Sequence, residues 1–197
     1  MLFRNAMIAT SLALFAVTLS ARGDGNAGKH VRPAMKAAGL DGKTHVLPLR
    51  DTRATLLIFV LHDCPVCNRY APEVKRIESD YRSKGVDTYV VYEERDLTPA
   101  QAIAHAKSYG LTCGLLYDPA HKLARDAGAA STPEAVVLSP DRRVVYHGRI
   151  DDRFQHFGMA NPAPSRRDLR AALDSFLAGN SVEVTETPVV GCAISKD

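Results

Sequence analysis

The chain has 197 residues, of which 46% are hydrophobic and 24% are charged, and its formal net charge at pH 7 is +3. These values are those of an ordinary globular protein with one domain and a short extension. No run of five or six like charges occurs, so the composition excludes the usual signatures of binding to nucleic acid or to an anionic membrane.

The N-terminal segment has the pattern of a secretory signal. Arg4 precedes an apolar stretch over residues 6–19, and small residues follow up to Ala21. This pattern predicts a signal peptide over residues 1–21, and therefore a periplasmic or secreted protein whose thiols work in an oxidising compartment. An uncleaved N-terminal anchor is the alternative, although the apolar stretch is short for a membrane-spanning helix.

The next segments lead into the domain. Residues 22–42 are rich in glycine and predict a linker, with a short helix over residues 31–38. Residues 44–51 predict a short strand with Pro48 at a sheet edge. Residues 55–61 are continuously apolar, which predicts a strand buried on both faces of a sheet.

A helix is expected to begin at the sequence Cys64-Pro-Val-Cys67. Pro65 suits the first turn, where its missing N–H costs nothing, and apolar residues then recur along one face as far as Gly85. Residues 86–92 predict the following strand.

Two shorter helices follow. Residues 98–101 have the pattern of a capping box, which predicts a helix to about Tyr109. Residues 118–128 predict another helix, with Asp118 as its N-cap and Pro119 at its first position.

The C-terminal half predicts two strands, residues 134–138 and 144–148, joined by a tight turn. Residues 165–168 are expected to cap a last helix that ends at Gly179. The order of elements predicts an α/β sandwich with a central mixed β-sheet flanked by helices.

The expected domain spans residues 43–180. A C-terminal extension over residues 181–197 carries the sequence Gly-Cys-Ala-Ile, of the pattern Gly-Cys-x-Ile.

The cysteine pair at the junction of a strand and a helix predicts redox chemistry. Unpaired N–H groups and the positive end of the helix dipole stabilise a thiolate at the first position. Cys64 is therefore the candidate nucleophile and the more exposed thiol, and Cys67, one turn further along, is the less exposed candidate resolving thiol. A structural zinc site would need a second such pair or a pair of histidines, and a purely structural disulfide is the other alternative.

Other polar and sulfur-containing residues are secondary candidates. Cys113 is interpreted first as a buried small hydrophobic residue. Three roles are possible for Cys192: a free thiol, half of a disulfide (including one to Cys113), or a third redox thiol. His147 is the histidine to test as a ligand, and Asp151 and Asp152 are interpreted as a turn.

The signal-like segment, the strand–CPVC–helix unit and Thr132-Pro133 before a pair of strands together resemble the thioredoxin superfamily, in particular its redoxin branch, which includes peroxiredoxin-like proteins. The resemblance covers residues 39–194. It implies a thioredoxin-like fold in which Pro133 is cis and faces the cysteine pair. It also implies that the backbone of Thr132 pairs with an extended substrate.

The sequence also departs from those relatives. Alignment of a peroxiredoxin motif on either cysteine fails; on Cys64 it places Leu61 at the hydroxyl position and Leu57 at the proline position. Asp63 stands where thioredoxins have tryptophan, and its charge would oppose a thiolate, whereas a protonated His62 would favour one.

These observations predict an exported thiol–disulfide oxidoreductase that needs no cofactor and no metal, because the electrons reside on two sulfurs. Its expected partners are a protein or small-molecule disulfide or thiol and an electron-transfer partner, with no nucleic acid and no membrane span after signal cleavage. A thiol peroxidase, a copper chaperone of the Sco kind and a protein-interaction module are the alternatives.

Overall fold

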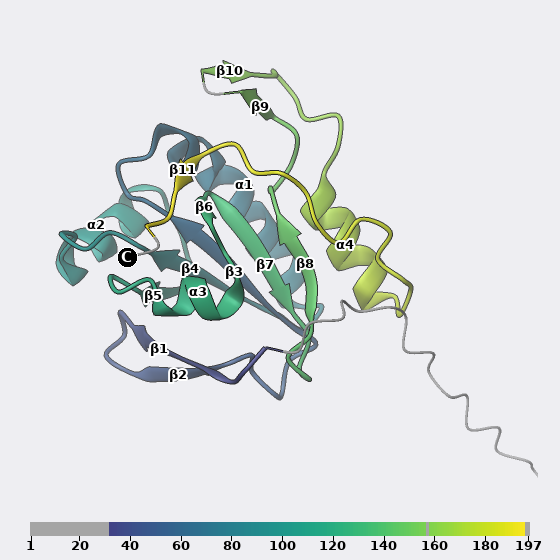
Figure 1. The fold of residues 1–197 in the computed structure, drawn as a ribbon, viewed down its shortest axis with the longest axis horizontal. Helices are drawn as coiled ribbons and strands as arrows, with labels where there is room; N and C mark the ends of the chain where they lie inside the picture. Colours follow the sequence, from purple (N-terminus) through teal and green to yellow (C-terminus); the bar gives the residue numbers. More distant parts are fainter. Residues whose placement is uncertain (1–31, 157, 196–197) are drawn as a thin grey trace, which may run out of the picture.

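The computed structural model describes residues 32–156 and 158–195, and a seven-stranded mixed sheet in the order β2-β1-β5-β4-β3-β7-β8 forms its centre (Figure 1). The predicted signal peptide lies outside the described residues. The sheet strands are β1 (Met35–Gly39), β2 (Thr44–Leu47), β3 (Ala54–Val60), β4 (Val86–Tyr92), β5 (Gly114–Tyr117), β7 (Glu134–Leu138) and β8 (Val144–Gly148). Short pairs are formed by β6 (Ser131–Thr132) with β11 (Cys192–Ala193), and by β9 (Phe154–His156) with β10 (Met159–Ala160).

Strand β3 is the centre of the core. It pairs in parallel with β4 and antiparallel with β7, and every one of its residues is buried. Leu56 and Ile58 pack into the core on one face of the sheet, whereas Leu57 and Phe59 pack into the core on the other. The residues of this strand are therefore continuously apolar for the predicted reason: the strand is buried on both faces of the sheet.

Helices cover both faces of this sheet. They are α1 (Pro65–Arg82), α2 (Pro99–Ser108), α3 (Lys122–Ala127) and α4 (Asp168–Leu177). Helices α1, α2 and α4 contribute to one core, and α3 contributes to the other. The predicted α/β fold, a mixed sheet flanked by helices, is confirmed. Among the described residues, the helices are all too short or too polar to cross a membrane.

The N-terminal lead-in differs from its prediction. Residues Met35–Gly39 form strand β1, which pairs with β2 and β5, so the predicted helix over residues 31–38 is wrong. Met35 and Ala37 are buried and alternate with exposed residues, which is the two-residue period of a strand. The stretch is so short that the same apolar positions also fit a helix, which is why the sequence alone misleads here. The sheet therefore begins before residue 43, where the predicted domain starts.

Two predicted helix starts are also wrong, for local reasons. Residues 118–121 form a turn closed by the hydrogen bond from His121 N to Asp118 O (2.8 Å), so α3 begins at Lys122 and His121 takes the N-cap position. The Asp118 carboxylate still caps the first turn, because it accepts a hydrogen bond from Ala124 N (2.9 Å). Ser165 does not cap α4, because its backbone N–H and its hydroxyl both donate to the carboxylate of Asp152. By contrast, the capping box at Thr98 and Gln101 is confirmed.

The segment after α4 returns to the sheet and then crosses it. His147 N donates to Thr185 O (2.9 Å) and Thr187 N donates to His147 O (3.1 Å), so this segment runs beside β8. It then passes over the ends of β7 and β6 to form β11, drawn in yellow in Figure 1. The C-terminal extension is thus part of the folded domain as far as residue 195.

Candidate active site

Cys64 occupies the N-cap position of α1. Its backbone is extended, Pro65 follows at the first helical position, and its sulfur accepts a hydrogen bond from Cys67 N at 3.5 Å. The first N–H groups of a helix have no partner within the helix, so a sulfur placed here is stabilised as a thiolate.

The two sulfurs have opposite proton affinities. A hydrogen bond from the Cys67 thiol, opposed by burial and helped by the backbone N–H groups of Cys67 and Val66, lowers the pKa of Cys64 to about 6. The same hydrogen bond and the burial of its own sulfur raise the pKa of Cys67 far above the usual value. At neutral pH the pair therefore holds one thiolate, on Cys64, and one thiol, on Cys67.

A short loop lies against this pair. The Thr132–Pro133 peptide bond is cis, as the resemblance implies, and a hydrogen bond involving the Thr132 side chain acts on the Cys67 sulfur. Glu134 fixes the loop: one carboxylate oxygen accepts the N–H groups of Ala130 (2.9 Å) and Ser131 (2.8 Å). The role of Thr132 and Pro133 in binding a substrate stays a prediction.

The histidine singled out as a possible ligand has a structural partner. The Nε2 atom of His147 forms an ion pair with the other carboxylate oxygen of Glu134, and this hydrogen bond raises the pKa of His147 above its usual value in spite of burial. His147 therefore supports the loop that precedes β7.

The expected exposure of the first cysteine is wrong in this structure. Cys64 is 3% exposed and Cys67 is 5% exposed, so Cys64 is not the more accessible thiol. The physical reason is strand β11, which pairs with β6 and places Cys192 Sγ 4.0 Å from Cys64 Sγ. The alternative of a Cys113–Cys192 disulfide is not found, because all four cysteines are free and Cys192 lies beside Cys64.

Charged groups flank the N-terminal side of Cys64. His62 Nδ1 lies 2.8 Å from Glu94 Oε1, and His62, Asp63 and Glu94 each place one donor atom within 4.8 Å of the others. Among the described residues these three have a spacing that can hold a metal ion, although exposed acidic groups often have this spacing without one. Neither Cys64 nor Cys67 belongs to this group.

The sequence does not reveal a buried carboxyl next to this group, that of Glu93, which directly precedes Glu94. Glu93 is 1% exposed, and in the described part of the chain neither of its carboxyl oxygens has a hydrogen-bond partner. Burial, with repulsion from Asp118 and Glu94, raises the pKa of Glu93 to about 9. It lines the same groove as His62 and Ile194, so this groove carries a neutral carboxyl. The sequence Glu-Glu-Arg after a buried strand offers no sign of this, because surface loops have the same composition.

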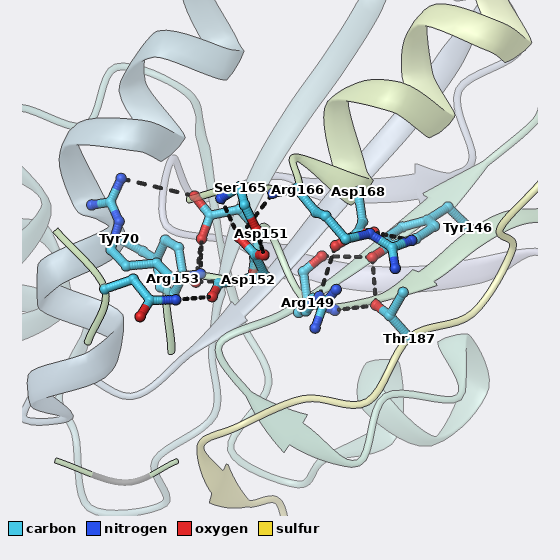
Figure 2. Close-up of polar contacts among 11 residues, drawn as sticks. Tyr70, Tyr146, Arg149, Asp151, Asp152, Arg153, Ser165, Arg166, Asp168 and Thr187 are labelled. Atoms are coloured by element: carbon cyan, nitrogen blue, oxygen red, sulfur yellow. Dashed lines mark hydrogen bonds and ion pairs between the residues drawn. The ribbon is translucent and has the colours of Figure 1, made fainter. Parts of the chain in front are cut away.

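Asp151 and Asp152 do more than form the turn that the sequence predicts. Both are buried, and Figure 2 shows them at the centre of a polar network. Asp151 Oδ1 accepts hydrogen bonds from the Tyr70 hydroxyl (2.6 Å) and from Arg153 N (2.9 Å), which ties helix α1 to the segment after β8. Two consecutive carboxylates three residues after the end of strand β8 are the available signal, but Tyr70, the partner that ties Asp151 to α1, lies 81 residues away in the sequence.

The comparisons with known proteins agree with this geometry. Residues 26–156 match the model of the family described as Redoxin. No curated protein sequence matches the chain at the significance required.

Solved structures match over most of the chain. A hypothetical protein from Sinorhizobium meliloti is 28% identical with a TM-score of 0.73, and the match covers 83% of this chain and 91% of that one. An uncharacterised conserved protein from Geobacillus kaustophilus is 27% identical with a TM-score of 0.75, covering 85% and 91%. A secreted disulfide oxidoreductase of Mycobacterium tuberculosis, homologous to DsbE of E. coli, is 17% identical with a TM-score of 0.53, covering 74% and 95%. At that identity the last match supports the fold alone.

Proposed function

The chain belongs to the Redoxin family, and from that premise we propose that it is an exported thiol–disulfide oxidoreductase whose redox couple is Cys64 and Cys67. The observation that carries the proposal is the pair itself. One sulfur sits at the start of α1 with its pKa lowered to about 6, and the other donates a hydrogen bond to it from one turn further along. A low thiol pKa makes a thiolate nucleophile available at neutral pH.

The proposed reaction consists of two exchanges. The Cys64 thiolate attacks one sulfur of a substrate disulfide, the substrate S–S bond breaks, and a mixed disulfide forms while one substrate thiolate leaves. Cys67 then attacks Cys64 Sγ, which releases the second substrate thiolate and closes the Cys64–Cys67 disulfide. The proton of Cys67 goes to the departing product, and the substrate gains two electrons that the pair has lost. An electron-transfer partner returns the pair to the dithiol, or the same steps run in reverse on a substrate dithiol.

Export is part of the proposal. Its support is the charged–apolar–small pattern of residues 1–21, together with a cysteine pair suited to a compartment in which disulfides persist. The periplasm or the cell exterior is the proposed location.

Cysteine variants test the function. Cys64→Ser should abolish the reduction of a model disulfide such as insulin, whereas the double variant Cys67→Ser/Cys192→Ser should accumulate a mixed disulfide on Cys64, because neither thiol beside Cys64 is left to resolve it. Cys113→Ala is the matched control, since burial raises the pKa of Cys113 to about 11 and its sulfur packs against the core. Full activity in both active-site variants would show that this pair is not the redox couple.

A second readout separates this function from peroxide chemistry. Consumption of hydrogen peroxide should be slow next to disulfide exchange, because Leu61 and Leu57 occupy the positions of the peroxiredoxin hydroxyl and proline. Rapid peroxide turnover that depends on Cys64 would favour the thiol peroxidase instead.

A further inference from the structure

The C-terminal strand occupies the edge at which an extended substrate is expected to pair. Cys192 is the register partner of Thr132, and Ala193 is the partner of Ser131, in an antiparallel bridge. The Thr132 hydroxyl lies 3.5 Å from Cys192 O, and Ile194 N donates to Ala130 O at 2.9 Å. Addition of an extended segment to an open strand edge is a common mode of peptide recognition. Here the segment comes from the same chain.

Gly191 shows that the contact is close. A Cβ atom at this position would overlap the carbonyl oxygen of Thr132 and approach Pro133 N. Only glycine lets the backbone of the segment lie directly on the Thr132–Pro133 peptide. The glycine of the Gly-Cys-x-Ile pattern thus has a steric reason.

Two anchors hold the segment in this place. Ile194, 8% exposed, packs into the core on the face of α3, so the isoleucine of the pattern secures the far end. Upstream, the Thr187 hydroxyl bonds to Tyr146 Oη (2.6 Å) and accepts from Arg149 N (3.0 Å), as Figure 2 shows. Residues 188–193 are therefore stretched between two fixed points.

Between the anchors, the segment presents a thiol to the active site. Cys192 Sγ lies 4.0 Å from Cys64 Sγ and is partly buried. A disulfide needs the sulfurs about 2 Å apart, so a side-chain rotation and a small shift of the strand separate this arrangement from a bond. Three thiols, Cys67, Cys64 and Cys192, thus form one cluster with Cys64 in contact with both of the others.

We propose that Cys192 is a third redox thiol of this site, which the C-terminal strand holds beside Cys64 so that it exchanges with the Cys64–Cys67 disulfide. The inference rests on the proposed function, because that function supplies the Cys64–Cys67 disulfide. The strand is then an internal substrate: it binds as an extended cysteine-containing peptide does, and external substrates of that class bind where it lies.

The exchange balances without any further oxidant. The Cys192 thiol loses its proton and its sulfur attacks Cys64 Sγ, the Cys64–Cys67 bond breaks, and a Cys64–Cys192 bond forms. The electron pair of the broken bond goes to Cys67, which takes up the proton. One disulfide is replaced by another, and the step is reversible when Cys67 attacks Cys64 again.

Disulfide mapping of the full chain tests the proposal. In Cys67→Ser, oxidised glutathione should produce an intramolecular Cys64–Cys192 disulfide and two molecules of reduced glutathione, seen by mass spectrometry of unreduced peptides. In the wild-type chain, a glutathione buffer should populate both the Cys64–Cys67 and the Cys64–Cys192 bonds. Cys64 found only as a glutathione adduct in Cys67→Ser, with Cys192 free, would overturn the proposal.

Two variants displace the strand without removing a thiol. Gly191→Ala removes the close approach to Thr132, and Ile194→Ser removes the anchor in the core. Each should raise the rate at which iodoacetamide labels Cys64 several-fold and should lower the yield of the Cys64–Cys192 disulfide. Unchanged labelling and unchanged yield in both variants would show that the strand does not cover the active site.

One matched pair separates this inference from the function it rests on. Cys192→Ser keeps the strand and removes the third thiol, so it should lose the Cys64–Cys192 species, while Cys113→Ala should retain it. If Cys64→Ser leaves disulfide reduction intact, the proposed function fails. If disulfide reduction depends on Cys64 but Cys67→Ser forms no bond to Cys192, only the role of Cys192 fails.

Discussion

At the scale of single residues, the four cysteines show how position decides chemistry. The pKa of Cys64 is lowered to about 6 by hydrogen bonds at the start of a helix, whereas burial raises that of Cys113 to about 11. Burial, and then repulsion from Cys64, raises the pKa of Cys192. The side chains are identical, so the differences in thiol pKa come from the backbone and the neighbours that surround each sulfur.

The buried carboxyl of Glu93 leads to a prediction about pH. Its folded pKa is about 9 and its ordinary value is 4.5, so between these values the unfolded chain binds fewer protons and stability falls as pH rises. Glu93→Gln removes this loss. The stability advantage of Glu93→Gln over wild type should therefore grow between pH 6 and pH 8, by up to roughly 2 to 3 kcal/mol, in urea unfolding.

The control for this prediction is Glu183→Gln, a change at an exposed carboxyl, which should leave the pH dependence as it is. Parallel stability curves for Glu93→Gln and wild type from pH 6 to pH 8 would mean that Glu93 is ionised in the folded protein.

At the scale of elements, helix α1 carries the cysteine pair and is fixed by buried ionic groups along its length. Tyr70 bonds to Asp151 near the start of the helix. One turn further on, Glu73 is 2% exposed and accepts hydrogen bonds from Arg76 (2.8 Å) and from Arg170 of α4 (2.7 Å). Because α1 and α4 lie on the same face of the sheet, this contact joins them directly.

Removal of the Glu73 charge should weaken the domain. Burial opposes ionisation, but hydrogen bonds from Arg170 and Arg76 outweigh it and lower the pKa of Glu73. The ion pairs therefore stabilise the fold above the unfolded pKa of about 4.5, and this contribution is lost as pH falls through the lower folded pKa. Glu73→Gln should destabilise the protein at pH 7 by about 3 kcal/mol, because it leaves the partly buried Arg170 guanidinium, within the described part of the chain, with the exposed Asp80 as its remaining carboxylate partner.

Thermal or urea unfolding at pH 7 and at pH 3 measures this effect, which should shrink at the lower pH. Asp80→Asn serves as the comparison, since Asp80 is 52% exposed and such pairs contribute below about 1 kcal/mol. Equal effects of the two substitutions at pH 7 would argue against a special role for the buried group.

At the scale of the whole molecule, sequence patterns predict the centre of the fold and miss its margins. Strand β3 and helix α1 have long, regular apolar patterns, and their positions follow from burial alone. Strand β5 has only four residues, too few for a period to show, and pairing with β4 is what makes it a strand. The Gly-Cys-x-Ile pattern was visible, but that it returns to Cys64 depends on contacts more than a hundred residues apart in the sequence.

Export makes a prediction for the whole chain. If residues 1–21 are a signal peptide, the protein isolated from its native host should begin near Arg22, after the small residues that precede the cleavage point. Intact-mass measurement of the native protein gives the answer directly. A mass that includes Met1 would contradict export by cleavage and favour the uncleaved anchor.

The position of β11 also determines how an outside molecule gains access to the active site. A tethered segment competes at an effective concentration set by its linker, on the order of millimolar for short flexible connections. Here only residues 188–191 separate Cys192 from the Thr187 anchor, so the local concentration of the competitor does not fall when the protein is diluted. A free peptide with only weak affinity for this edge therefore loses the competition, and a dissolved small thiol meets a Cys64 that is 3% exposed. We therefore expect a productive partner to make additional contacts outside the edge that β11 occupies, so that affinity elsewhere on the surface becomes the condition for reaching the Cys64 sulfur.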